Sequence, residues 1–180
     1  MAAPRTIHFI VVLCILRYVK GTLGHGLQFS SQSSLVLSGY SDVDWVGDPT
    51  DQRSTSDYCL YLGDSHISWR SKKQSVVSHS STESEYCAPA DATSEILWLR
   101  WLLADIGVPQ SSATILHCDK CSAIQIAHND VFHEHTKHIE NGCYSISTAE
   151  KPADILIKAL PPGRFLQLLN KLKLIPTLPP

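Results

Sequence analysis

The order of hydrophobic patterns along the chain constrains its fold more than any other sequence feature. Three short segments have the character of β-strands: Leu35–Tyr40, Tyr58–Leu62 and His66–Arg70. A short Gly-containing turn separates the last two, so the three segments predict an antiparallel meander. From Thr82 onward, apolar residues recur at helical spacing as far as Ile106. This change of period predicts a sheet followed by one long helix.

The predicted long helix has a start signal and one apolar face. Thr82 and Glu85 have the spacing of a capping box, which places the start of the helix at Thr82. Apolar residues at helical spacing then predict the face that covers the sheet. The residues expected in the core or at its edge are Ile96, Leu99, Leu103, Trp98 and Trp101.

The second half of the chain adds further elements. Thr114–Cys118 predicts a short strand, and Ser122–His128 and Pro152–Leu160 predict short helices. The resulting order, βββαβα plus a C-terminal helix, indicates an α/β domain with a mixed sheet. A chain of 180 residues with 43% hydrophobic content can bury a single core.

Four acidic residues stand at the ends of these predicted elements. Asp42 and Asp119 follow strand-like runs, whereas Glu85 and Asp154 lie at the start of helical segments. A fold that brings these ends together would form a pocket rich in carboxylate oxygens, which suits magnesium. Two such ions roughly 4 Å apart can activate a water and stabilise a leaving oxygen in phosphodiester cleavage. The pattern therefore favours a nuclease.

Six sequence motifs follow one another along nearly the whole chain. They are Ile15-Leu16-Arg17-Tyr18-Val19-Lys20-Gly21-Thr22, Gly39-Tyr40-Ser41-Asp42-Val43-Asp44-Trp45-Val46-Gly47-Asp48, Arg53-Ser54-Thr55-Ser56, Ser68-Trp69-Arg70-Ser71-Lys72-Lys73-Gln74, Ser80-Ser81-Thr82-Glu83-Ser84-Glu85-Tyr86 and Thr136-Lys137-His138-Ile139-Glu140. In this order they resemble the C-terminal part of a copia-type retrotransposon Pol polyprotein. The resemblance implies the ribonuclease H domain that follows the reverse transcriptase, with a ribonuclease H-like fold.

This resemblance implies a division of the chain and a set of partners. Residues 1–22 resemble the tail of the polymerase region, 23–34 form a linker, 35–160 form the ribonuclease H-like domain, and 161–180 form a C-terminal helix and a disordered tail. The implied substrate is an RNA/DNA hybrid, of which the RNA strand is cut. The implied cofactors are two Mg²⁺ or Mn²⁺ ions, and the remainder of the Pol polyprotein is an implied partner.

The resemblance also implies the residues of the site. Carried over position by position, the metal-binding acids are Asp42, Glu85, Asp119 and Asp154, with Asp44 as the local competitor of Asp42. Each acid alone has an ordinary explanation as a turn, capping or helix-dipole residue, so that only the joint pattern favours a site.

A histidine-rich segment follows these acids in the sequence. It contains His133, His135 and His138, and His138 is the leading candidate to carry a proton to the leaving group. Solvated loop histidines are nevertheless more common than catalytic ones.

The charge of the chain gives no strong signature of nucleic-acid binding. The formal net charge is −2. Acids at a metal site lower this total, and bound metal ions restore positive charge locally. Basic residues concentrate in Trp69-Arg70-Ser71-Lys72-Lys73, which is either a solvated turn or a contact for backbone phosphates.

Cysteine usage and the N-terminal pattern indicate an intracellular protein, in the cytoplasm or nucleus, that is neither secreted nor inserted in a membrane. The six cysteines show no disulfide framework. Cys118 and Cys121 with the following histidines approach the spacing of a zinc finger but lack its hairpin and aromatic residue. The apolar run Ile7–Leu16 is interrupted by His8 and is too short to span a bilayer.

Three departures from the family pattern concern the site. Pro89 cannot donate to the carbonyl of Glu85, and a proline within a helix costs about 3 kcal/mol and predicts a kink. Lys120 places a cation beside Asp119. The segment between Glu140 and Asp154 is too short for the helix and strand found in relatives, so we expect a sheet that lacks one strand and one helix. The alternative function is therefore an inactive retrotransposon remnant with weak nucleic-acid binding.

Overall fold

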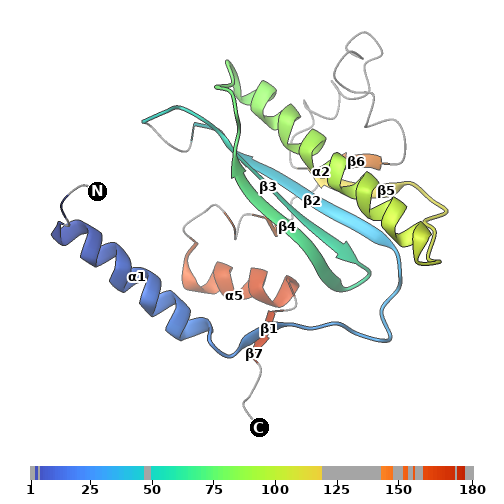
Figure 1. Cartoon of the computed structure of the whole chain (residues 1–180), viewed down its shortest axis with the longest axis horizontal. Helices are drawn as coiled ribbons and strands as arrows, with labels where there is room; N and C mark the ends of the chain where they lie inside the picture. Colours follow the sequence, from blue (N-terminus) through green and yellow to red (C-terminus); the bar gives the residue numbers. More distant parts are fainter. Residues whose placement is uncertain are drawn as a thin grey trace.

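The computed structural model of the chain describes residue 3 and residues 5–46, 50–118, 143–147, 152–153, 156, 160–172 and 174–176. The elements in chain order are α1 (Thr6–Thr22), β1 (His25–Leu27), β2 (Leu37–Asp44), β3 (Thr55–Leu62), β4 (Ser65–Lys73), α2 (Ser81–Asp105), β5 (Thr114–Cys118), β6 (Cys143–Ser147), α5 (Pro162–Lys171) and β7 (Leu174–Pro176) (Figure 1). The candidate site residues Asp119, Asp154 and His138 lie outside the described residues, as does the helix expected at Ser122–His128.

The centre of the fold is a five-stranded mixed sheet in the order β4-β3-β2-β5-β6. Strands β2, β3 and β4 pair antiparallel as a meander, whereas β5 is parallel to β2, and β6 is parallel to β5. The predicted meander, the long helix after it and the mixed sheet are confirmed. The architecture is α/β and is compatible with a ribonuclease H-like fold.

The expectation of a missing strand is wrong. Residues Cys143–Ser147, in the segment that looked too short, form β6 and complete the sheet beside β5. Five residues suffice because a strand rises about 3.3 Å per residue and needs to match only the short β5. The expected loss of a helix from this segment concerns residues outside the described part of the chain.

Strand β2 is longer than predicted, which changes the surroundings of Asp42. The expected strand ended at Tyr40, but β2 continues to Asp44 because its backbone stays paired with β3. Asp42 is therefore opposite Asp57 within the ladder and is not a turn residue after the strand.

Helix α2 covers one face of the sheet and builds the main core with it. Ile96, Leu99 and Leu103 are buried as predicted. Gly39 leaves room for side chains of the neighbouring strands, because a Cβ there would lie 2.6 Å from Leu60 Cδ2 of β3 and 3.1 Å from Leu116 Cδ1 of β5. Trp98 and Trp101 are exposed, so their predicted place in the core is wrong. The buried residues of this cluster are Leu37, Tyr58, Leu60, Ala92, Ile96, Leu99, Leu103, Leu116 and Cys118.

The start of α2 differs from the predicted capping box. Ser80 is the N-cap, and its hydroxyl accepts a hydrogen bond from the Glu83 N–H at 3.2 Å. The Glu83 carboxylate in turn accepts from the His79 N–H at 2.7 Å. The predicted pairing of Thr82 with Glu85 is wrong because the N-cap lies two residues earlier, at Ser80, so this cap uses Glu83 and not Glu85. The helix continues through Pro89, which is buried.

A smaller cluster lies on the opposite face of the sheet, where α5 packs (Figure 1). Its buried residues are Cys59, Tyr61, Ala153 and Leu172. Below it, β1 pairs antiparallel with β7, so the expected linker contains a short strand. Helix α1 has no buried residue. No helix within the described ranges combines the length and apolar character needed to span a membrane.

Candidate functional site

The end of the sheet where β2 finishes also holds the start of α2. The Gln74 side chain fixes this arrangement, since its Nε2 donates to Ser56 Oγ on β3 at 2.8 Å and to the Ser84 carbonyl on α2 at 3.0 Å. Ser78 Oγ donates to Gln74 Oε1 at 2.9 Å and so orients the amide. Asp42 on β2 and Glu85 in the second turn of α2 are thereby brought to the same end of the sheet.

The opposite end of α2 is held by Arg100. Its Nη1 donates to the Ser112 carbonyl at 2.7 Å and to Thr114 Oγ1 at 3.0 Å, and its Nη2 donates to the Gln110 carbonyl at 3.0 Å. Because Thr114 is the first residue of β5, this contact ties the helix C-terminus to the beginning of that strand. Helix α2 therefore runs antiparallel to β2 and β5.

Because β2 and β5 pair in parallel, their C-terminal ends lie at this same end of the sheet. Tyr40 is the register partner of His117, and the two rings stack with centroids 4.6 Å apart. Asp42 and Asp119 each come two residues after this pair in the sequence. The C-terminal ends of β2 and β5 meet at one edge, as the metal-site hypothesis requires, although Asp119 itself is not among the described residues.

Asp42 faces a second carboxylate that the sequence did not reveal. Asp57 on β3 is its direct partner in the antiparallel ladder, and side chains at such positions share one face with Cβ atoms about 4.5–5.5 Å apart. Asp42 is 6% exposed and Asp57 is fully buried. Like charges at this separation disfavour each other's ionisation unless a proton or a cation lies near them. The pair is therefore suited to a positively charged partner.

Asp57 was missed because the predicted strand began at Tyr58, one residue too late. The signal that could have found it is a charged residue at the margin of a strongly apolar strand. Asp57 also influences Cys59, which lies two residues further along the same face of β3. Burial raises the pKa of the Cys59 thiol to about 12, and the charge of Asp57 adds to the rise.

The two faces of β2 separate the acids from the α2 core. Alternation places Asp42 on the face of Tyr40, whereas Gly39 lies under α2. Glu85 is half-buried on α2. Within the described parts of the chain, no three His, Cys, Asp or Glu side chains form a group that could hold a metal ion. The convergence of Asp42 and Glu85 with Asp119 and Asp154 thus stays a prediction, as does the role of His138.

The choice between Asp42 and Asp44 is informed by burial. Asp44 lies one same-face step further along β2, opposite Thr55, and is half-exposed. Asp42 has the more enclosed position and the acidic partner. Carboxylate oxygens on adjacent strands are the donors that Mg²⁺ and Mn²⁺ prefer, so the donor chemistry around Asp42 fits a hard cation.

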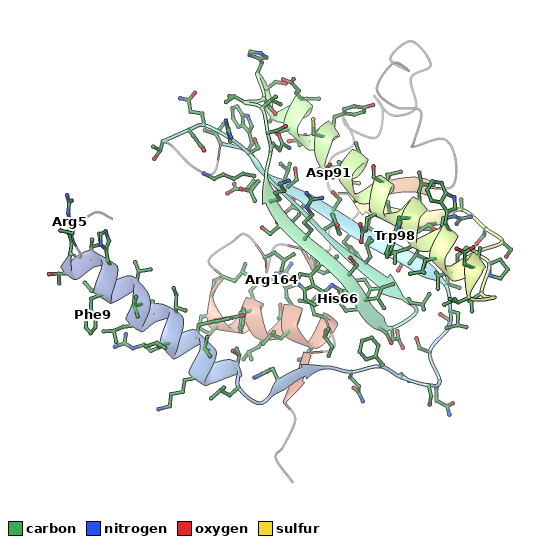
Figure 2. The ribbon with its side chains drawn as sticks, in the orientation of Figure 1. Arg5, Phe9, His66, Asp91, Trp98 and Arg164 are labelled. Carbon is green, nitrogen blue, oxygen red and sulfur yellow. The ribbon has the colours of Figure 1, made fainter. Side chains whose placement is uncertain are left out.

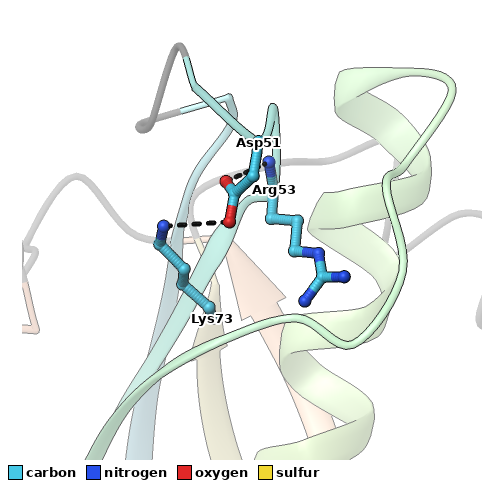
Figure 3. A network of polar contacts seen from close by, with 3 residues as sticks. All are labelled: Asp51, Arg53 and Lys73. Carbon is cyan, nitrogen blue, oxygen red and sulfur yellow. Dashed lines mark hydrogen bonds and ion pairs between the residues drawn. The ribbon is translucent and has the colours of Figure 1, made fainter.

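The basic cluster Trp69-Arg70-Ser71-Lys72-Lys73 forms the second half of edge strand β4 and is not a turn. All five residues are exposed. Lys73 Nζ lies 3.1 Å from Asp51 Oδ2, and Asp51 Oδ1 accepts from the Arg53 N–H at 3.2 Å (Figure 3). This surface ion pair contributes little to stability, about 0–1 kcal/mol.

Comparison with known proteins identifies the family. The chain is 36% identical over 189 residues to the retrovirus-related Pol polyprotein from transposon RE2 of Arabidopsis thaliana, covering 97% of this chain and 13% of the relative. The corresponding values are 37% over 186 residues, 96% and 13% for transposon RE1 of the same plant. They are 36% over 176 residues, 90% and 13% for transposon TNT 1-94 of Nicotiana tabacum. The chain belongs to the copia-type Pol polyproteins.

The match covers nearly the whole of this chain but only a small part of each relative. No protein-family model matches the chain, and the chain spans only 13% of the length of these three curated relatives. The match to the RE2 polyprotein is 189 residues long, whereas 97% of this 180-residue chain is about 175 residues. This Pol segment is therefore about 14 residues shorter than the relative across the matched region.

Proposed function

We propose that this Pol segment is a ribonuclease H that hydrolyses the RNA strand of RNA/DNA hybrids with two magnesium or manganese ions. The observation that carries the proposal is the buried carboxylate of Asp42 at the edge where parallel β2 and β5 end and α2 begins. At that edge three separate elements can contribute oxygen ligands to one site. Membership of the Pol family supports the same conclusion.

Each acid has a distinct role in this proposal. Asp42, Asp119, Glu85 and Asp154 would hold the two cations, with Asp42 and Asp119 shared at the centre, Glu85 binding one ion and Asp154 positioning the other. Bound divalent cations supply Lewis-acid stabilisation of the leaving oxygen and a water of lowered pKa as the nucleophile. His138 carries a proton to the leaving group, and contact with the 2′-hydroxyl distinguishes RNA from DNA.

Asp57 adds to the electrostatics of this site. A buried carboxylate directly opposite Asp42 increases the local negative potential, which favours cation binding and disfavours the cation-free pair. We place the enzyme inside the cell, together with the remainder of the Pol polyprotein, because its substrate would be the hybrid made during reverse transcription.

A hydrolysis assay with two matched variants tests the proposal. A hybrid with labelled RNA is incubated with the chain, with and without magnesium, beside duplex DNA and single-stranded RNA. Asp42→Asn should abolish magnesium-dependent cleavage of the hybrid at unchanged fold and hybrid binding, because it removes charge at constant shape. Asp44→Asn should have a much smaller effect. Activity that survives Asp42→Asn, or that falls only with Asp44→Asn, contradicts the assignment.

An inactive remnant with weak nucleic-acid binding is the second candidate, favoured by the deficit of about 14 residues against the RE2 polyprotein. A metal ligand must usually be held within about 0.5 Å of its working position. A shortened connection before Asp154 would impair that precision, and Pro89 would add to the loss. A variant with a helix inserted between Ser147, the last residue of β6, and Asp154 should then cleave faster than the natural chain. Equal and vigorous cleavage by both excludes the remnant.

A further inference from the structure

The outward side of α2 carries a row of exposed side chains. Trp98 and Trp101 form its centre and are 52% and 66% exposed. Asp91 lies seven residues before Trp98, and Asp105 lies four residues after Trp101, and both acids are exposed. Because a helix turns once in 3.6 residues, these intervals keep the four side chains on one side, away from the sheet. The row is called the α2 stripe and consists of Asp91, Ser94, Trp98, Trp101 and Asp105.

Helix α1 carries a second row, with the opposite charge at its ends. Phe9 and Leu16 lie in its centre and are 62% and 57% exposed. Arg5, the N-cap residue, and Lys20, in the last turn, flank them, and both are exposed. Intervals of three and four residues place these side chains on one side of the helix. The row is called the α1 stripe and consists of Arg5, Phe9, Val12, Leu16 and Lys20.

The α1 stripe faces away from the rest of its own chain. Tyr18 of α1 lines a cavity together with Leu27 of β1 and with Leu169 and Leu172 from the C-terminal part of the chain. Leu16 stands two residues before Tyr18, which is about 200° around the helix axis, so it points to the opposite side. The chain itself therefore covers the Tyr18 side of α1 and leaves the α1 stripe open.

The two stripes do not meet within one copy of the chain. Figure 2 shows Arg5 and Phe9 on α1 well separated from Asp91 and Trp98 on α2. Strand β1 follows α1 almost directly and pairs with β7, and this pairing holds α1 at its place. A contact between the stripes therefore needs a second copy.

Charge and length match between the two stripes. Helix α1 contains no Asp or Glu, and Arg100, the one basic residue of α2, is bound to the segment 110–114. Lys20 follows Arg5 by 15 residues, and Asp105 follows Asp91 by 14. At about 1.5 Å per residue, the two rows are roughly 22 and 21 Å long. When their apolar centres are in contact, a cation therefore meets an aspartate at each end.

Apolar contact and charge have separate effects in such a pairing. A helix that is apolar on all sides, as α1 is, normally lies buried. Contiguous exposed apolar side chains mark interaction sites, and tryptophan is among the residues that most often dominate binding. An exposed ion pair adds little affinity, but it disfavours arrangements that bring like charges together. The apolar centres thus supply affinity, and the charged ends set the alignment.

We propose that two copies of this chain associate through these rows, with the α1 stripe of one copy packed on the α2 stripe of the other. The helices run antiparallel, so that Lys20 meets the partner's Asp91 and Arg5 meets the partner's Asp105. This orientation also places the positive N-terminal end of α1 beside the negative C-terminal end of α2. Reciprocal use of both stripes closes a symmetric dimer. The inference goes beyond the proposed nuclease and does not depend on it, because no acid of that site belongs to either stripe.

Sedimentation velocity of the full chain tests the association. The natural chain, of 19.9 kDa, should sediment as a dimer that dissociates on dilution. Trp98→Ala should raise the dissociation constant roughly thirtyfold, because it truncates a central aromatic anchor. Trp69→Ala should leave it unchanged, because Trp69 is equally exposed, at 51% against 52%, but lies on β4.

A matched pair of substitutions tests which side of α1 is used. Phe9→Ser should raise the dissociation constant roughly tenfold. Ile7→Ser should have little effect, since Ile7 is 63% exposed, against 62% for Phe9, but lies on the other side of the helix. Far-UV circular dichroism and thermal unfolding verify that each variant keeps its fold.

Exchange of charges tests the alignment. Asp91→Lys should weaken the association roughly fivefold, whereas Asp64→Lys, the same change at an exposed turn position, should not. Adding Lys20→Asp to Asp91→Lys should restore the association, because opposite charges then face each other again. If Lys20→Asp instead rescues Asp105→Lys, the antiparallel arrangement is wrong.

Three results would overturn the dimer. One is a chain that stays monomeric up to about 1 mM, where even weak complexes form. Another is a dimer that Trp98→Ala and Phe9→Ser leave intact, because its interface then lies elsewhere. The third is a monomer whose α1 instead binds another segment of the Pol polyprotein. None of these results bears on hybrid hydrolysis, so the proposed function is tested separately.

Discussion

The two faces of the central sheet bury different kinds of side chain. The face under α2 is apolar, with Leu37, Leu60 and Leu116 packed against the helix. The opposite face buries the carboxylates of Asp42 and Asp57. Apolar burial contributes about 25 cal/mol per Å², whereas burying a charge costs energy unless a partner offsets it. The first face therefore stabilises the fold through apolar contacts, and the second holds the acidic groups of the proposed site.

Neighbouring residues of β5 give the sharpest test of this contrast. Leu116 is fully buried under α2, while Ile115 points to the other side and is 43% exposed. Leu116→Ala should reduce the free energy of unfolding by about 2–5 kcal/mol, because it removes buried methyl groups and leaves a cavity. Ile115→Ala should cost less than about 1 kcal/mol. Denaturant titration of both variants measures the difference, and equal losses would show that the two faces contribute alike.

A pair of glycine substitutions probes how tightly Leu60 and Leu116 pack around Gly39 on the face under α2. Gly39→Ala should destabilise the protein by about 1–3 kcal/mol, because its Cβ would meet Leu60 Cδ2 at 2.6 Å and Leu116 Cδ1 at 3.1 Å. Gly21→Ala in α1 meets nothing within 4 Å and should instead favour the helix by about 0.5–1 kcal/mol. Circular dichroism with denaturant melts reports both. A neutral Gly39→Ala would mean that Leu60 can move aside.

Asp57→Asn tests the charge on the opposite face. Removing one of two facing carboxylates should raise the free energy of unfolding by about 0.2–1 kcal/mol at neutral pH without divalent cations. The same change should reduce the stabilisation that magnesium gives, because a cation then meets less negative charge. Melts with and without magnesium measure the two effects. A loss of stability in Asp57→Asn without magnesium would show that its charge is already well compensated.

His66 should make the opposite face sensitive to mild acid. Burial lowers the pKa of His66 below its ordinary value of 6.5, so near and below pH 6.5 the unfolded chain binds a proton that the folded chain does not. Its contribution to stability is therefore present above pH 6.5, declines as pH falls from there and levels off below the lowered pKa. Melting temperatures of the natural chain and His66→Phe between pH 8 and pH 5 should diverge in this sense. Parallel profiles would place the titration elsewhere.

Sequence alone determined the features that rest on local pattern. The meander, the long helix after it and the buried positions Ile96, Leu99 and Leu103 follow from periods of two and of 3.6 residues. The motif order also determined the family. Local pattern misplaced the start of α2, because Ser80 and Thr82 are both good N-cap residues and only the backbone geometry selects between them.

Tertiary structure decided which residues meet. Asp57 is the partner of Asp42 because of the register in which β2 and β3 pair. Residues 45–54 connect the two strands, and a connection of this length does not fix that register before the strands pair. The exposure of Trp98 on a helix whose other side is buried, and the pairing of β6 with β5, were likewise set by contacts distant in sequence. Helix α1 shows the limit most clearly: it is the most apolar stretch near the N-terminus, yet none of its residues is buried, because apolar composition supplies a surface to bury but not the partner surface.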